Sequence, residues 1–159
     1  MDLVQHKMAS KIGDLFLVAS EKGLKGIYWK KQPSGLMSSL KRTSAADKIL
    51  VDTERQLNEY FFGKRKVFDI SFDLEGTDFQ QTVWQALLSI PFGQTVSYAN
   101  IAKKIKNPKA VRAVGSANGK NPVCIIIPCH RVIASDGSIG GYAGGIDIKE
   151  KLLTHEMSF

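Results

Sequence analysis

The hydrophobic pattern of the first half of the chain predicts a small sheet. Residues 12–19 and 26–29 are short and rich in apolar side chains, and residues 21–23 form a glycine-containing turn between them. The region 3–28 is therefore expected to be a meander of strands. Residues 67–74 alternate apolar and polar side chains, which is typical of a half-buried strand.

One helix is expected in this half. Apolar side chains recur at helical spacing over residues 45–62, and Gly63 is placed to end the helix. The first half thus reads as a small α/β domain without evident chemistry, and we expect a linker near residues 73–77.

The second half has the pattern of helices. Thr77 and Gln80 form a capping-box signature, and apolar residues then recur at helical spacing as far as Pro91. Ser97 is placed to cap a second helix, and residues 109–119 form a third segment with many small side chains. Two short basic helices joined by an Asn-Pro turn predict a helix-turn-helix. The alternative is that the small residues only allow two structural helices to pack closely.

The main candidate for chemistry is the segment 125–132. Three isoleucines predict a short buried strand, which Pro128 ends, and Cys129, His130 and Arg131 follow. A thiol reacts as its thiolate, which a neighbouring base and cation favour. Cys129 can equally be an ordinary buried cysteine, because adjacent side chains of an extended segment point to opposite faces.

The charge of the chain favours an anionic partner. The net charge is +7 and the isoelectric point is about 9.4. Residues 79–135 contain no acidic residue, and their basic residues are Lys103, Lys104, Lys106, Lys109, Arg112, Lys120 and Arg131. A basic cluster can bind nucleic acid or can simply be solvated surface, and charge alone leaves both readings open.

Two features near the C-terminus extend the candidate site. Residues 135–145 form a glycine-rich loop without the Gly-Lys-Ser/Thr ending of a Walker loop, and Tyr142 in it can cover one face of a flat ligand. Residues 146–155 are expected to form the last helix. Glu156, which follows this helix, can reach His130 and hold its tautomer, as the third group in the activation of a nucleophile.

Composition limits the class of protein. The hydrophobic content of 43% is enough for a core. The only cysteines are Cys124 and Cys129, and their spacing disfavours a disulfide framework or a cysteine zinc site. The chain shows neither a leader pattern nor an apolar run long enough for a bilayer, so a soluble cytoplasmic protein without membrane contact is expected.

Four segments together carry a family resemblance. They are the motif at residues 128–132, the Asn-Pro pair at 121–122, the loop at 142–145 and the helix end at 149–156. In this combination they resemble the O6-alkylguanine-DNA alkyltransferases, also called methylated-DNA–protein-cysteine methyltransferases.

The resemblance implies a fold and an activity. The fold is a small ribonuclease-H-like α/β domain over residues 1–76, followed by a mainly helical domain with a helix-turn-helix over residues 77–159. The activity is DNA repair by a single-turnover methylated-DNA-[protein]-cysteine S-methyltransferase, which flips the damaged base and moves its alkyl group irreversibly to a cysteine. The implied partner is double-stranded DNA that contains O6-alkylguanine or O4-alkylthymine. No cofactor, metal or obligate protein partner is implied, and a monomer is expected.

The resemblance also implies roles for five residues of the catalytic site. Cys129 accepts the alkyl group, His130 deprotonates it through a bridging water, and Glu156 holds His130 in the basic tautomer. Asn121 braces the turn between helix and active site. Tyr98 donates a hydrogen bond or proton to N3 of guanine and crowds the backbone phosphate.

DNA contacts are implied as well. Arg112 enters the duplex through the minor groove and fills the space of the flipped nucleotide. The other implied contacts are Ser97, Lys109, Ala113, Gly115, Asn118, Tyr142 and Ala143. Animal members carry a serine at the position of Ala143, so a contact with O6 there would come from the backbone. Cys124 lies where some members have proline.

Two other function classes stay open beside repair. A non-catalytic binder of alkylated DNA resembles the family but lacks the acceptor cysteine that Cys129 supplies. The other class is a thiol hydrolase or a helix-turn-helix regulator that shares only the pattern. A hydrolase would turn over repeatedly, and a regulator would bind one DNA sequence in preference to others.

Overall fold

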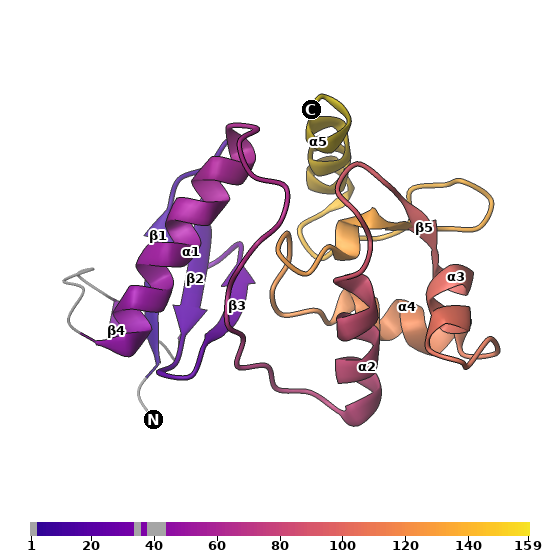
Figure 1. The fold of residues 1–159 in the computed structure, drawn as a ribbon, viewed down its shortest axis with the longest axis horizontal. Helices are drawn as coiled ribbons and strands as arrows, with labels where there is room; N and C mark the ends of the chain where they lie inside the picture. The colour runs from indigo at the N-terminus through magenta and orange to yellow at the C-terminus, as the bar shows by residue number, and fades with distance from the viewer. Residues whose placement is uncertain (1–2, 34–35, 38–43) are drawn as a thin grey trace. The chain divides into compact units, whose positions relative to one another are not determined.

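The computed structural model describes residues 3–33, 36, 37 and 44–159. The chain forms two compact units, the first ending at Glu75 and the second running from Gly76 to Phe159 (Figure 1). Each unit has its own core and is described by itself.

A small sheet forms the first unit. Its strands are β1 (Val4–Met8), β2 (Leu15–Ala19), β3 (Leu24–Tyr28) and β4 (Leu36–Met37). They lie in the order β3-β2-β1-β4, with antiparallel pairs except for β4, which is parallel to β1. The meander expected over residues 3–28 is confirmed, because β1, β2 and β3 are antiparallel neighbours in chain order.

Helix α1 (Ala45–Phe61) packs on this sheet (Figure 1). Ser44 caps it by accepting a hydrogen bond from the backbone N–H of Asp47, and Leu50, Leu57 and other residues of one face are buried. Gly63 follows the helix with φ of 75°, a conformation that glycine adopts without strain. The predicted helix and its stop are confirmed.

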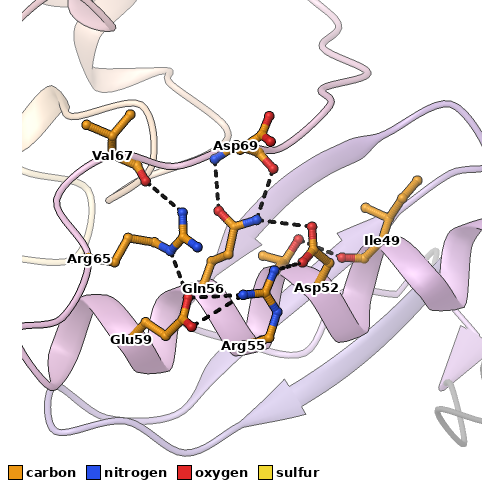
Figure 2. A network of polar contacts seen from close by, with 9 residues as sticks. Ile49, Asp52, Arg55, Gln56, Glu59, Arg65, Val67 and Asp69 are labelled. Carbon is orange, nitrogen blue, oxygen red and sulfur yellow. Dashed lines mark hydrogen bonds and ion pairs between the residues drawn. The ribbon is translucent and has the colours of Figure 1, made fainter.

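The strand predicted at 67–74 is wrong. These residues make a single isolated bridge to β3, and before it the side chain of Gln56 in α1 binds the backbone of Asp69, while that of Arg65 binds the carbonyl of Val67 (Figure 2). Gln56 is buried, and its amide donates to the carbonyl of Asp69 at 2.9 Å and accepts from the N–H of Asp69 at 2.8 Å. Arg65 bonds Glu59 at 2.8 Å. A side-chain amide thus occupies the groups that a neighbouring strand would pair, so alternation of polarity did not imply a strand.

Helices form most of the second unit. They are α2 (Asp78–Leu87), α3 (Tyr98–Lys104), α4 (Val111–Gly119) and α5 (Ile146–Met157), with the one-turn 3-10 helix η1 (Cys129–Arg131) between α4 and α5. Two short strands, β5 (Val96–Ser97) and β6 (Val132–Ile133), pair in parallel. The expected mainly helical part of the fold is confirmed.

The helix starts follow the sequence signals. Thr77 and Gln80 form a complete capping box, and Ser97 forms another with Asn100. Helix α4 packs against both α2 and α3, and the indole N–H of the buried Trp84 donates to the carbonyl of Ala117 at 2.9 Å. Helices α3 and α4 therefore form the predicted helix-turn-helix pair (Figure 1).

The strand predicted at the isoleucines is also wrong. Ile125, Ile126 and Ile127 are buried, as expected, but they lie in a turn, and Ile125 has φ of 78°. The side chain of Asn121 holds this turn at both ends: it accepts from the N–H of Val123 at 3.0 Å and donates to the carbonyl of Ile127 at 2.7 Å. A short apolar run shows burial, and these local hydrogen bonds decide its conformation.

None of the helices in the described parts of the chain is both long and apolar enough to cross a membrane.

Candidate active site

The candidate nucleophile lies at the first position of η1. Cys129 exposes only 3% of its surface. Its backbone is fixed, because its N–H donates to the carbonyl of Ile127 at 2.8 Å and its carbonyl accepts from the Asn118 side chain at 3.4 Å. The turn at residues 123–127 and the end of α4 together position the sulfur.

His130 is paired with Glu156 in the interior. Nε2 of His130 lies 2.6 Å from Oε2 of Glu156, and neither side chain has appreciable exposure. An ionised carboxylate can only accept, so Nε2 must carry the proton and Nδ1 must be the acceptor nitrogen. Glu156 thereby selects the tautomer in which His130 can take a proton at Nδ1.

Glu156 is ionised despite its burial. Burial works against the charge, but hydrogen bonds from His130 and Arg131 hold the pKa of the Glu156 carboxyl far below its ordinary value. Nε of Arg131 donates to Oε1 at 2.7 Å and Nη2 donates to Oε2 at 3.0 Å. The N–H of Gly93 adds a longer contact of 3.5 Å.

The guanidinium group of Arg131 is bonded to groups other than the Cys129 thiol. Its guanidinium forms the fork to Glu156, and Nη1 donates to the carbonyl of Ile90 at 2.7 Å. The hypothesis that Arg131 supplies a cation to Cys129 is therefore wrong, and Arg131 instead links Glu156 to the backbone of Ile90.

His130 is a neutral base at rest. Burial lowers the pKa of His130, and this effect exceeds the opposite one from Glu156. Its Nδ1 is buried and has no hydrogen-bond partner among the described residues. An acceptor nitrogen in this position is available to one further donor.

The Cys129 thiol is protonated in the resting protein. Its hydrogen bond with Cys124 and its burial raise the pKa of the Cys129 thiol well above the ordinary value. Asn121 and Lys149 act in the opposite direction but do not outweigh these causes. The sulfur therefore needs a base at the moment of reaction, because its surroundings do not keep it as a thiolate.

Sequence reasoning assigned no role to Lys149. This lysine of α5 is fully buried, and Nζ donates to the carbonyls of Val132 at 2.7 Å and Gly141 at 3.2 Å. Burial lowers its pKa. The available signal was spacing, because Lys149, Leu152 and Glu156 share one face of the last helix.

Tyr98 lies at the start of α3 beside small residues. A Cβ at Gly140 would lie 3.0 Å from the Tyr98 hydroxyl, and one at Gly115 would lie 3.8 Å from its ring. Burial raises the pKa of the Tyr98 hydroxyl, which stays protonated and can donate. Ser97 is half-buried, and its side-chain oxygen caps α3.

The remaining predicted DNA contacts divide into two groups. Exposed or half-buried positions are Lys109, Arg112, Ala113, Gly115, Tyr142 and Ala143. Asn118 is buried, and its side chain points to the Cys129 carbonyl. The geometry therefore connects Asn118 with the active site and not with a DNA surface.

Among the described residues, no three His, Cys, Asp or Glu side chains gather where they could hold a metal ion.

The His130–Glu156 pair predicts loss of stability in acid. The pKa of His130 is lowered from 6.5 and that of Glu156 from 4.5, so the unfolded chain binds more protons than the folded one as pH falls. The free energy of unfolding should decrease as pH falls below 6.5, and again below 4.5. Urea unfolding along a pH series measures this. A stability that is level from pH 8 to about 5 would contradict it.

Both halves of the chain match known family models. Residues 3–74 match the model described as "6-O-methylguanine DNA methyltransferase, ribonuclease-like domain", and residues 78–158 match its "DNA binding domain". A methylated-DNA–protein-cysteine methyltransferase of Methanosarcina acetivorans is 46% identical over 155 residues, which cover 94% of this chain and 95% of the relative. The protein of the same name from Mycobacterium tuberculosis is 58% identical over 103 residues, covering 65% of this chain and 62% of the relative.

Solved structures agree. The O6-methylguanine methyltransferase of Mycobacterium tuberculosis superposes with a TM-score of 0.86 at 42% identity, covering 98% of this chain and 93% of that chain. A crystal structure of Mycobacterium tuberculosis OGT in complex with DNA gives a TM-score of 0.86 at 44% identity, covering 97% of this chain and 92% of the other.

Proposed function

Because the chain belongs to the 6-O-methylguanine DNA methyltransferase family, we propose that it repairs alkylated DNA by moving the alkyl group from O6 of guanine to Cys129. The observation that carries this proposal is the buried His130–Glu156 pair next to a buried thiol. It leaves Nδ1 of His130, the residue next to Cys129 in sequence, as an acceptor without a partner among the described residues.

The proposed reaction is one displacement. Nδ1 of His130 takes the proton of the Cys129 thiol through a water, and the imidazolium that forms is stabilised by Glu156. The sulfur attacks the alkyl carbon, the new C–S bond forms and the C–O6 bond breaks. Its electron pair moves onto the guanine, which Tyr98 neutralises by donating to N3. No water attacks the thioether, so each molecule reacts once.

DNA binding by the helix-turn-helix is the second part of the proposal. The exposed lysines and Arg112 of this region have no acidic residue beside them in sequence, and the solved relative was crystallised with DNA. Contacts with phosphates orient a protein without reading sequence. Extruding a base costs a few kcal/mol, and less for a poorly paired lesion, which favours the damaged nucleotide. The protein would act as a monomer on duplex DNA that contains O6-alkylguanine.

A single experiment tests the reaction. The protein is mixed with a duplex carrying one O6-methylguanine, and the tryptic peptide 121–131 is then sequenced by fragmentation, since this peptide contains both cysteines. One methyl group on Cys129 per molecule supports the proposal. Repaired DNA beside an unmodified peptide would indicate a turning-over hydrolase, and binding without repair would indicate a lesion binder. Either result rejects the proposed function.

Arg112→Ala should reduce repair of duplex DNA more than repair of a free base. Arg112 is exposed on α4 and is the long side chain available to fill the space of a flipped nucleotide. Because extrusion costs a few kcal/mol, we expect the rate on duplex to fall on the order of tenfold or more. Transfer from free O6-benzylguanine base should be unchanged. Lys109→Ala is the control, since it removes a neighbouring charge without removing the intercalating side chain. Equal loss on both substrates would contradict this role.

Lys106→Gly should make the protein more stable and weaken its binding to DNA. Lys106 has φ of 61° directly after α3, where the N–H groups of Lys106 and Asn107 close the helix end. Glycine is favoured at this position, so the free energy of unfolding should rise by up to about 1 kcal/mol. If the ammonium group contacts a phosphate, the slope of log affinity against log salt should become smaller by about 0.9.

Urea unfolding and fluorescence anisotropy at several salt concentrations measure the two effects. Lys106→Asn is the matched control, because asparagine tolerates the same backbone conformation without the charge. It should weaken DNA binding equally and change stability less. An unchanged salt slope in both variants would remove Lys106 from the DNA contacts.

A further inference from the structure

The buried lysine of the second unit joins two backbone segments beside the acceptor cysteine. Nζ of Lys149 in α5 donates to the carbonyl of Val132 at 2.7 Å and to the carbonyl of Gly141 at 3.2 Å. Val132 directly follows η1, and its N–H donates to the carbonyl of Cys129. Gly141 belongs to the glycine-rich loop of residues 135–145. The ammonium group therefore ties this loop to the strand that continues from the Cys129 turn.

The charge of Lys149 is buried at a cost to stability. Lys149 has no exposed surface, and its hydrogen-bond partners in the described part of the chain are two backbone carbonyls and no carboxylate. An apolar side chain of similar length would fill the same space without the cost of removing a charge from water. What the charge provides is a pair of strong hydrogen bonds, one to the loop and one to the strand.

The part of the loop next to Lys149 lies against the Tyr98 hydroxyl. Gly140 has φ of 74°, and a Cβ there would lie 3.0 Å from the hydroxyl oxygen of Tyr98 and 3.5 Å from Nζ of Lys149. Gly137 in the same loop has φ of 87°, but a Cβ there would meet nothing within 4 Å. The close approach is therefore specific to the segment that Lys149 holds.

The backbone of Tyr98 is placed by the strand that Lys149 binds. Strand β6, which starts at Val132, pairs with β5, and Ser97 at the end of β5 caps α3. Tyr98 is the first residue of that helix. Lys149 is thus connected to Tyr98 in two ways, through the β5–β6 pair at its backbone and through Gly140 at its hydroxyl.

We propose that Lys149 is a positioning residue, which holds the glycine-rich loop against Tyr98 and so keeps the Tyr98 hydroxyl aimed at the leaving base. A donor that is oriented in advance stabilises the charge that develops on the guanine without having to reorganise during the reaction. Misplacement of such a group by about 1 Å can slow a reaction by about a hundredfold. The effect on rate rests on the proposed function, whereas the tether between loop and strand does not.

Lys149→Met removes the charge and keeps the length of the side chain. The rate of methyl transfer at saturating O6-methylguanine duplex should fall on the order of tenfold. The affinity for duplex should be unchanged, because Lys149 has no exposed surface to offer to DNA. Lys151→Met is the matched control, since Lys151 is exposed on the same helix, and it should keep the wild-type rate. Equal rates in the two variants would overturn the proposal.

A double-mutant cycle with Tyr98→Phe separates positioning from a general loosening of the fold. If Lys149 acts through the Tyr98 hydroxyl, Lys149→Met should slow transfer by less than about twofold in protein that already carries Tyr98→Phe. The same fractional loss with and without Tyr98→Phe would mean that Lys149 acts independently of this hydroxyl, and the proposed role would be refuted.

A protease measures the tether without DNA. Loss of the tether should free the loop, so chymotrypsin should cut folded Lys149→Met after the half-buried Tyr142 several-fold faster than it cuts Lys151→Met. Equal cleavage rates would reject the tether whatever the activity. A wild-type protein that transfers no methyl group would reject the proposed function, and faster cleavage of Lys149→Met would then still support the tether.

Gly140→Ala and Gly137→Ala form a second pair if Lys149→Met does not fold. Both substitutions place alanine at a positive φ in the same loop, but only at Gly140 does the added carbon approach the Tyr98 hydroxyl and the Lys149 ammonium group. Transfer should be slower in Gly140→Ala than in Gly137→Ala at equal duplex affinity. Equal transfer rates would show that the contact with Tyr98 has no effect on the reaction, which contradicts the proposal.

Discussion

Replacing Cys129 with alanine is expected to abolish methyl transfer and to leave duplex binding almost unchanged. The sulfur is the only atom in the proposed reaction that forms a bond with the alkyl carbon. The helix-turn-helix is unaffected, because Cys129 contacts α4 through its backbone carbonyl, which alanine keeps. Transfer from radiolabelled O6-methylguanine duplex and anisotropy on the same duplex measure the two properties.

Cys124→Ala is the control for this prediction. It removes a buried thiol five residues earlier, in the turn that precedes η1, and its methyl transfer should persist. Methyl appearing on Cys124 in the Cys129→Ala protein would contradict the assignment of a single acceptor. Loss of duplex binding in Cys129→Ala would mean that the sulfur supports the fold, and the activity result would then carry no weight.

Glu156→Gln should have the largest effect on stability. The carboxylate accepts hydrogen bonds from both His130 and Arg131 in the interior, and a neutral amide leaves the guanidinium charge of Arg131 buried without a counter-charge. Breaking a buried pair of this kind costs roughly 3–5 kcal/mol. Methyl transfer should also fall strongly, because His130 loses the group that fixes its tautomer.

Denaturant unfolding and single-turnover kinetics test this variant. Glu150→Gln changes the same kind of side chain on the exposed face of α5 and should alter the free energy of unfolding by less than about 0.5 kcal/mol. If the two variants were equally stable, Glu156 would not be the counter-charge of Arg131.

Sequence reasoning identified helices better than strands. Thr77, Ser97 and Gly63 mark helix ends through hydrogen bonds or backbone conformations that involve only neighbouring residues, so their types identify those ends. The strands predicted at 67–74 and within 125–132 failed for a different reason. In both places the side-chain amide of a distant or preceding residue, Gln56 or Asn121, takes the backbone groups of the segment.

The sequence predicted which residues form the site, but it did not predict the protonation state of the thiol or the partners of the buried charged side chains. The contact between His130 and Glu156 was expected and is present. The raised pKa of Cys129, the attachment of Arg131 to Glu156 and the burial of Lys149 depend on packing in three dimensions. Adjacency of Cys129, His130 and Arg131 in sequence suggested that the cation serves the thiol, but the one-turn helix η1 directs their side chains to different partners.

The carboxylate that pairs with His130 and Arg131 belongs to Glu156, about 25 positions later in the chain. This order affects how the second unit folds during synthesis. Until α5 has docked, the guanidinium group would have to enter the interior without a counter-ion, at a cost of several kcal/mol. A nascent chain that has left the ribosome only as far as β6, which includes Arg131 but not Glu156, therefore gains little from closing its core. The helical unit should assemble in one cooperative step late in synthesis, with the thiol sheltered only once that step is complete.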